Sequence, residues 1–212
     1  MNNRRFSFSD RLLGEIDKAI KVLSVPARSS REIAAPQMAD PLPERDRMES
    51  ARLMRVNHSG EVAAQALYQG QALTAQKPAV AAAMRRAARE EIDHLAWCED
   101  RLRELKGRTS ALNPIWYVGS FAIGALAGVL GDETSLGFVA ETEKQVESHL
   151  RGHLSRLAPS DHRSRAVLEQ MTHDEVQHAT DAASLGAKPL PFVLRTAMRL
   201  TSRVMTRSSY WL

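Results

Sequence analysis

The sequence contains little cysteine, few aromatic residues and no excess of glycine or proline. The single cysteine, Cys98, excludes a disulfide within the chain, and we expect it to be a buried, inert thiol. The first twenty residues lack both an uninterrupted apolar stretch and a small-residue cleavage site, so we expect no secretory signal. Alanine, leucine, arginine and glutamate dominate the 212 residues, which predicts an all-α fold with one domain of ordinary size.

The charge of the chain, +4 overall, is concentrated at its C-terminus. No acid follows Asp181, whereas five basic residues do: Lys188, Arg195, Arg199, Arg203 and Arg207. Apolar residues surround these arginines, which predicts a basic amphipathic helix within 188–212 that suits an anionic membrane surface. Packing against the rest of the protein or a second copy of the chain is the alternative. No nucleic-acid-binding motif accompanies the charge, so we expect no nucleic acid partner.

The chain divides into three parts by its hydrophobic pattern. Residues 1–47 predict an amphipathic helix near 6–23 and then a proline-rich linker or surface arm. Residues 48–187 contain four helical segments, near 48–76, 79–106, 133–157 and 161–185, separated by proline and glycine. Four helices of this length with a long crossover between the pairs predict a four-helix bundle, followed by the C-terminal helix of 188–212.

Each bundle helix carries a carboxylate on its predicted inner stripe. The second and fourth helices also carry a histidine three residues later, in EEIDH and DEVQH, so that both side chains share one face. The inward set is Glu61, Glu91, His94, Glu143, Glu175 and His178. Glu61 and Glu91 are 30 residues apart, and Glu143 and Glu175 are 32 apart, which indicates a repeated helical hairpin.

A buried cluster of four carboxylates requires compensation, because burial and mutual repulsion cost several kcal/mol per ion. Two divalent cations would balance the four charges. A glutamate from each of two helices, with Glu-x-x-His from each of the other two, is the ligand set of di-iron and di-manganese carboxylate bundles. The excess of carboxylate and the absence of thiolate favour iron or manganese over zinc.

Several neighbouring residues are weaker candidates. Asp93 and Asp174 precede ligands and are placed in a supporting role or on the helix surface, and Glu90 lies off the stripe. Glu147 and His149 are candidates for the edge of the site. His58, His162 and His173 are expected on the surface.

Residues 111–131 contain no charge and are just long enough to span a membrane. A single crossing would leave Glu61 and Glu91 on the opposite side from Glu143 and Glu175. A shared metal site therefore predicts that 112–131 lies on or dips into one leaflet, or packs on the bundle or a partner.

With these residues placed, the chain resembles the demethoxyubiquinone hydroxylase family over about residues 48–212. The matching segments are NHSGEVAA at 57–64, EEIDHL at 90–95, ETEKQVESHL at 141–150 and DEVQH at 174–178. The resemblance implies a ferritin-like bundle with additional membrane-facing helices and two iron ions as cofactors. The implied ligands are Glu61, Glu91, His94, Glu143, Glu175 and His178, with Glu91 and Glu175 bridging the irons.

The resemblance further implies a monooxygenase of ubiquinone biosynthesis that hydroxylates a demethoxy polyprenyl quinol with dioxygen and electrons from an external donor. It also implies peripheral association with the lipid surface, here expected on the cytoplasmic face of the cell membrane. Leu150 follows His149, where animal relatives have a tyrosine, so an electron-relay role for that pair is not expected.

Other functions are compatible with the ligand set alone. They are iron storage, peroxide reduction and a metal-free adaptor at a membrane surface. The sequence leaves open whether the chain forms a homo-oligomer or joins a biosynthetic complex. It also leaves open what residues 1–47 do.

Overall fold

The computed structural model describes residues 8–33 and 41–212, and all regular secondary structure in this part of the chain is helical, with no strand there. The helices are α1 (Phe8–Ser24), α2 (Glu44–Thr74), α3 (Pro78–Glu104), α4 (Asn113–Val129), α5 (Asp132–Arg156), α6 (His162–Ser184) and α7 (Phe192–Trp211). The all-α prediction is confirmed. α2, α3, α5 and α6 are the four predicted bundle helices, and α2 begins four residues before its predicted start.

Local signals set the helix ends. Pro78 begins α3, where its fixed φ and missing N–H cost nothing. The Asp161 carboxylate accepts a hydrogen bond from the Ser164 backbone N–H and caps α6. After α6, Gly186 adopts a φ of +98°, a conformation that favours glycine and turns the chain away from the helix axis.

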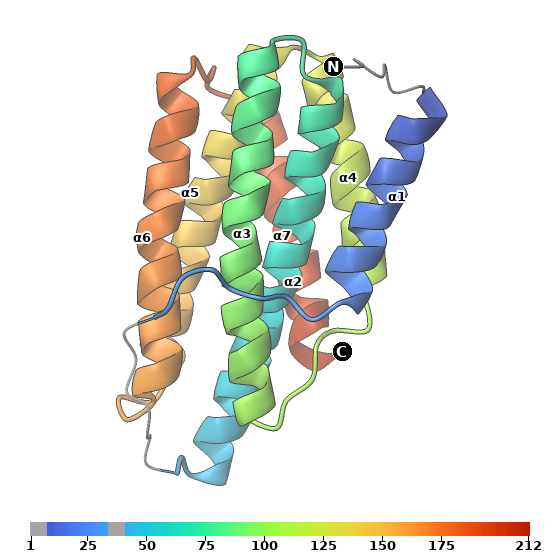
Figure 1. The fold of residues 1–212 in the computed structure, drawn as a ribbon. Coiled ribbons are helices and arrows are strands. Elements are labelled where there is room, and N and C mark those ends of the chain that lie inside the picture. The colour runs from blue at the N-terminus through green and yellow to red at the C-terminus, as the bar shows by residue number, and fades with distance from the viewer. Residues whose placement is uncertain (1–7, 34–40) are drawn as a thin grey trace.

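The bundle consists of two hairpins, α2–α3 and α5–α6, each with a short connection (Figure 1). Two apolar clusters fill its interior. One contains Leu53, Met54, Cys98, Leu102, Leu168 and Met171. The other contains Tyr68, Val80, Met84, Leu136, Val139 and Ala182. On every bundle helix the inward carboxylate falls in sequence between residues of these two clusters, so the polar centre lies between two apolar layers.

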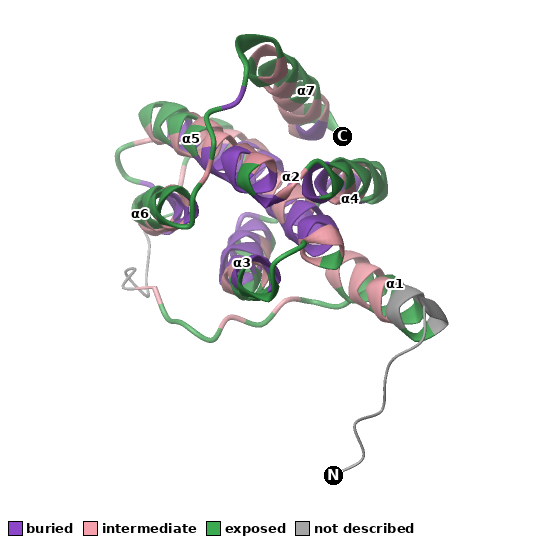
Figure 2. Cartoon of the chain, turned by 90° about the horizontal axis from the view of Figure 1, so that it is seen from above, coloured by how far each residue is buried: buried purple, intermediate pink, exposed green. Residues whose placement is uncertain are grey.

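The crossover helix α4 packs closely along α2 because glycines remove side chains from the contact. Gly124 lies against the Leu67 carbonyl, and Gly70 lies against the Phe121 carbonyl. The outer face of α4 remains exposed, including Ile115 and Val118. α4 and α7 lie on the side of α2 and α5 that faces away from α3 and α6 (Figure 2). No helix of residues 8–33 and 41–212 combines the length and apolar character needed to cross a membrane.

The segment after α1 runs across α3 toward α6, as an arm on the bundle surface (Figure 1). The Ala27 N–H donates to Glu99 and the Ser30 N–H donates to Asp93, so two acids of α3 hold it. Part of the N-terminal prediction, residues 1–7 and 34–40, lies outside the described residues. The three-part division of the chain stays a prediction.

Candidate metal centre

The six side chains selected from the sequence meet in the middle of the bundle. Glu61 comes from α2, Glu91 and His94 from α3, Glu143 from α5, and Glu175 and His178 from α6. All are buried, and His178, the most exposed, retains 8% of its surface.

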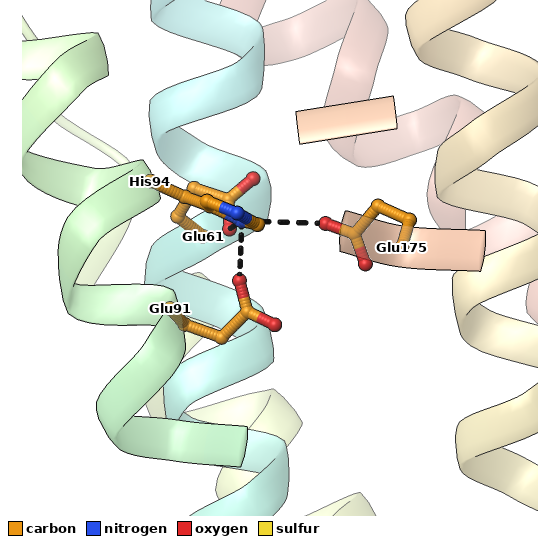
Figure 3. A group of neighbouring side chains, drawn as sticks. All are labelled: Glu61, Glu91, His94 and Glu175. Carbon is orange, nitrogen blue, oxygen red and sulfur yellow. Dashed lines mark ion pairs between the residues drawn. The ribbon is translucent and has the colours of Figure 1, made fainter. Parts of the chain in front are cut away.

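These residues form two overlapping groups, each with ligand atoms within 4.8 Å of one another. The first group is Glu61, Glu91, His94 and Glu175 (Figure 3). The second group is Glu91, Glu143, Glu175 and His178. Glu91 and Glu175 belong to both groups, so the arrangement suits two cations that share two carboxylates.

Both histidines direct Nδ1 into the cluster. His94 Nδ1 lies 2.7 Å from a Glu91 oxygen, 3.4 Å from Glu175 and 3.7 Å from Glu61 (Figure 3). His178 Nδ1 lies 3.1 Å from Glu91 and 3.6 Å from Glu175. The Glu-x-x-His spacing produces this convergence, because residues three apart share one helix face.

The outer nitrogen of each histidine contacts an acid of the opposite helix. His94 Nε2 lies 2.9 Å from Asp174 of α6, and His178 Nε2 lies 3.1 Å from Glu90 of α3. A proton held on Nε2 by these acids leaves the Nδ1 lone pair for a metal. Asp174 and Glu90 each precede a Glu-x-x-His pair. This shared position is the sequence signal that identifies both acids, although Glu90 lies off the inward stripe.

Burial makes the metal-free cluster electrostatically unequal. Burial raises the pKa of Glu61 well above its ordinary value, and burial together with the charge of Glu175 does the same for Glu143. Burial also acts to raise the pKa of Glu91, but the two histidines outweigh it and the pKa lies well below the usual range. Burial opposes the charge of His178, yet the neighbouring carboxylates of Glu175 and Glu91 raise its pKa to about 12.

These shifts in pKa leave the hydrogen-bonding groups of the cluster unsatisfied. Among the described residues, the buried atoms without a hydrogen-bond partner include both Glu91 oxygens, His94 Nδ1, Glu175 Oε2 and His178 Nδ1. Some lie within ion-pair distance of each other, but without hydrogen-bonding geometry. Unsatisfied polar atoms aimed at one point are unfavourable in a native interior. A pair of cations would satisfy them, so the residues present fit a metal centre.

Tyr68 completes the wall of the site on the α5 side. Its hydroxyl donates a hydrogen bond to Glu143, and the residue is fully buried. Burial and the neighbouring charge of Glu143 raise the pKa of Tyr68 well above its ordinary value. The phenol therefore stays protonated and remains a donor to the carboxylate.

The NHS segment before Glu61 joins α2 to three other helices. Asn57 pairs with His153 of α5 at 2.8 Å, and the Ser59 hydroxyl donates to Asn113 of α4. His58 lies 3.3 Å from Glu99 of α3. The expectation that His58 lies on the surface is wrong, because this residue is buried among those polar partners.

Of the remaining weaker candidates, some lie where the sequence predicts and others lie outside the ligand groups. His162 and His173 are exposed and Cys98 is buried, as expected. Glu147 pairs with Arg151 and His149 lies against His153, so neither belongs to the two ligand groups. Asp93 is buried and binds the N-terminal arm.

Comparison with known proteins agrees with this geometry. Residues 48–209 match the family model described as ubiquinone biosynthesis protein COQ7. A 3-demethoxyubiquinol 3-hydroxylase of Bordetella pertussis is 54% identical over 211 residues, which cover 99% of this chain and 95% of the relative. The protein of that name from Nitrosospira multiformis is 53% identical over 203 residues, covering 95% and 98%.

A solved structure with a similar fold is the dodecameric thioferritin of Bacteroides fragilis, a bacterioferritin-related protein. It superposes with a TM-score of 0.54 at 16% identity, over 68% of this chain and 85% of that one. This likeness supports the ferritin-like bundle. The match of one family model to three quarters of the chain, and near full-length relatives above 50% identity, show that the chain belongs to the COQ7 family of ubiquinone biosynthesis proteins.

Proposed function

We propose that this chain hydroxylates the ring of 3-demethoxyubiquinol with dioxygen at a centre of two iron ions. The observation that carries the proposal is the pair of overlapping ligand groups whose buried atoms lack hydrogen-bond partners. The family and the names of its relatives supply the substrate class, a quinol of ubiquinone biosynthesis.

In this proposal Glu61 and His94 would hold one iron and Glu143 and His178 the other, with Glu91 and Glu175 available to both. Four carboxylates and two imidazoles without a thiolate suit iron better than zinc, which prefers fewer, softer ligands.

The iron pair would supply the redox chemistry with dioxygen that side chains lack. One oxygen atom enters the ring and the other leaves as water, so each turnover consumes two electrons and two protons from outside. The protein fixes the ligands, and the apolar clusters on both sides exclude water. Asp174 and Glu90 keep the protons of His94 and His178 on Nε2, away from the metals.

A small cavity marks an opening to this centre between α3 and α6. Its volume is about 20 Å³, and Tyr68, Met84, Glu90, His178 and Leu185 contribute to its lining. Such a space holds one molecule of the size of water or dioxygen. A quinol ring is larger, so its binding requires the lining side chains to move.

The reaction requires two further partners: a lipid surface that holds the polyprenyl tail of the substrate, and a donor of two electrons. The exposed apolar face of α4 and the basic helix α7 lie on one side of the bundle, and we place them against the cytoplasmic face of the cell membrane (Figure 2). An external reductant, free or in a biosynthetic complex, delivers the electrons.

The test is an anaerobic iron-loading experiment followed by a single exposure to isotopically heavy dioxygen. The full chain is loaded with ferrous iron, mixed with a short-tailed demethoxy quinol and a reductant, and the product is analysed by mass spectrometry. We expect two irons per chain and label in the new ring hydroxyl. Iron oxidation without ring label would support storage or peroxide reduction, and a chain that takes up no iron would support the metal-free adaptor.

A further inference from the structure

The two outer acids of the metal centre are held differently. Glu90, beside His178, has 44% of its side chain exposed. Asp174, beside His94, has only 13% exposed and accepts hydrogen bonds from Gln170 and Arg31. The acid beside His94 is therefore held in place by more contacts than the acid beside His178.

Arg31 belongs to residues 27–31, here called the strap, which crosses α3 on its way toward α6 (Figure 1). The strap is anchored at two points on α3. The Ala27 N–H donates to Glu99 at 2.9 Å, and the Ser30 N–H donates to Asp93 at 2.6 Å. The strap precedes residue 48, where the match to the family model begins.

The Arg31 guanidinium joins the two helices that carry the Glu-x-x-His pairs. Its Nε donates to Asp93 of α3 at 2.7 Å, and its Nη2 donates to Asp174 of α6 at 2.8 Å. The Asp174 oxygen that accepts this bond is the one that lies 2.9 Å from His94 Nε2. A planar guanidinium with separate donors suits this bridge, whereas a lysine ammonium cannot reproduce its geometry.

Trp97 of α3 contacts both the backbone and the side chain of Arg31. Its indole N–H donates to the Arg31 carbonyl at 3.2 Å, and the guanidinium carbon lies 4.9 Å from the ring centroid. The same indole lies 5.3 Å from the His94 ring. Arg31 is thus fixed at its backbone and at its side chain, although 42% of that side chain is exposed.

We propose that Arg31 is a positioning residue of the metal centre, through which the strap holds Asp174 against His94 and strengthens metal binding in the group that contains His94. The inference rests on the proposed metal centre and adds a role for a segment outside the matched family region. The imidazole can coordinate without Arg31, but Asp174 would then keep only Gln170 and His94 as partners, and the orientation of His94 would be less firmly fixed.

The test uses cobalt(II) as a spectroscopic probe in the metal-free, full-length protein. Wild type is compared with Arg31→Gln, Arg31→Lys and the control Arg28→Gln, which removes an exposed arginine from the same strap. Loss of a partner that orients a ligand directly lowers metal affinity 10–100-fold, so for Arg31, one contact further out, we expect about 10-fold or somewhat less. The loss should fall on one of two ions, with a changed visible spectrum. Arg31→Lys should restore part of the affinity, and Arg28→Gln should match wild type.

A double-mutant cycle with Asp174→Asn checks the route. If Arg31 acts through Asp174, Arg31→Gln adds no further loss in the Asp174→Asn background. Additive losses would overturn the inference. So would an Arg31→Gln protein with wild-type affinity and spectrum, even if its melting temperature fell, because the strap would then be only structural. A wild-type chain that binds no cobalt would instead refute the metal centre itself, and this inference with it.

Discussion

The acid before each Glu-x-x-His pair contacts the histidine of the opposite pair. Asp174 of α6 contacts His94 of α3, and Glu90 of α3 contacts His178 of α6. One short motif therefore supplies both a ligand set for its own helix and an orienting acid for the other. This reciprocity links α3 to α6 through polar contacts at the level of the proposed metals.

Glu143 offers a direct test of the ligand set, because it occurs in only one of the two groups. Glu143→Gln keeps the volume of the side chain and the contact with Tyr68 but removes the negative charge. We expect iron content after anaerobic loading and desalting to fall from two ions to about one per chain, with at least a 100-fold loss of hydroxylation. Glu147→Gln on the same helix is the control. A Glu143→Gln protein with two irons and full activity would contradict the assignment.

The lowered pKa of the buried His153 should reduce the free energy of unfolding in mild acid. Burial, with the nearby charges of His149 and Arg156, lowers its pKa to about 3, compared with 6.5 in the unfolded chain. Between these values the unfolded chain binds more protons, so this contribution is complete above pH 6.5 and is lost as the pH falls. From pH 7.5 to 5.5 the loss amounts to about 1.4 kcal/mol.

Urea unfolding of metal-free wild type and His153→Gln at the two pH values isolates this contribution. Glutamine is neutral at both and can still donate to Asn57. The ligand histidines, whose pKa values are raised, contribute equally to both proteins and cancel in the comparison. The stability advantage of wild type should shrink by about 1.4 kcal/mol on acidification. An advantage independent of pH would show that folding does not lower the pKa of His153.

At the level of helices, the hydrophobic period and the positions of proline and glycine predict the four bundle helices and most of their ends. Pro78 and Gly186 mark real ends, and the 3.6-residue stripe placed each inward carboxylate on the correct face. The start of α2 was missed because Glu44–Arg47 is polar and shows no apolar period. The strap could not be predicted, because Arg31 and Asp174 are 143 residues apart and no local pattern links them.

The close contact between α2 and α4 at Gly124 predicts that a larger side chain there destabilises the protein. A Cβ at Gly124 would collide with the Leu67 carbonyl, and backbone cannot move aside as a flexible side chain can. We expect Gly124→Ala to lower the free energy of unfolding by about 1–3 kcal/mol. Gly119→Ala in the same helix is the control, since nothing lies within 4 Å of its added Cβ. That change should be neutral or stabilise by up to about 1 kcal/mol. Equal effects in thermal unfolding would mean that α4 does not pack closely on α2.

At the scale of the whole molecule, the metal centre and the apolar surface lie on different sides of the α2–α5 layer. The small opening to the centre is between α3 and α6, and α4 and α7 cover the opposite side (Figure 2). Exposed apolar residues on those two helices include Val118 and Leu126 of α4 and Val193 and Val204 of α7. Arginines along α7 accompany them, so this side combines the two features of a membrane-binding surface.

This arrangement predicts binding to anionic vesicles through one face. Each arginine near an anionic surface contributes about 1 kcal/mol, so reversing the charge of Arg199 and Arg203 together should weaken partitioning by roughly 30-fold or more. Co-sedimentation with vesicles containing anionic lipid measures the effect, and added salt should reduce wild-type binding because it screens these charges.

The matched control reverses two exposed arginines of α3, Arg85 and Arg89. Helix α3 lies on the other side of the α2–α5 layer from α4 and α7 (Figure 2). Both double variants change the net charge by the same amount and at the same helical spacing. A membrane face on α4 and α7 requires that only the α7 variant loses binding. Equal losses would show that overall charge drives adsorption, and binding lost only in the α3 variant would move the membrane to the side where the metal centre opens. Replacing Val118 with glutamate then separates the apolar contribution of α4 from the charge of α7, because insertion of α4 requires an uncharged outer face.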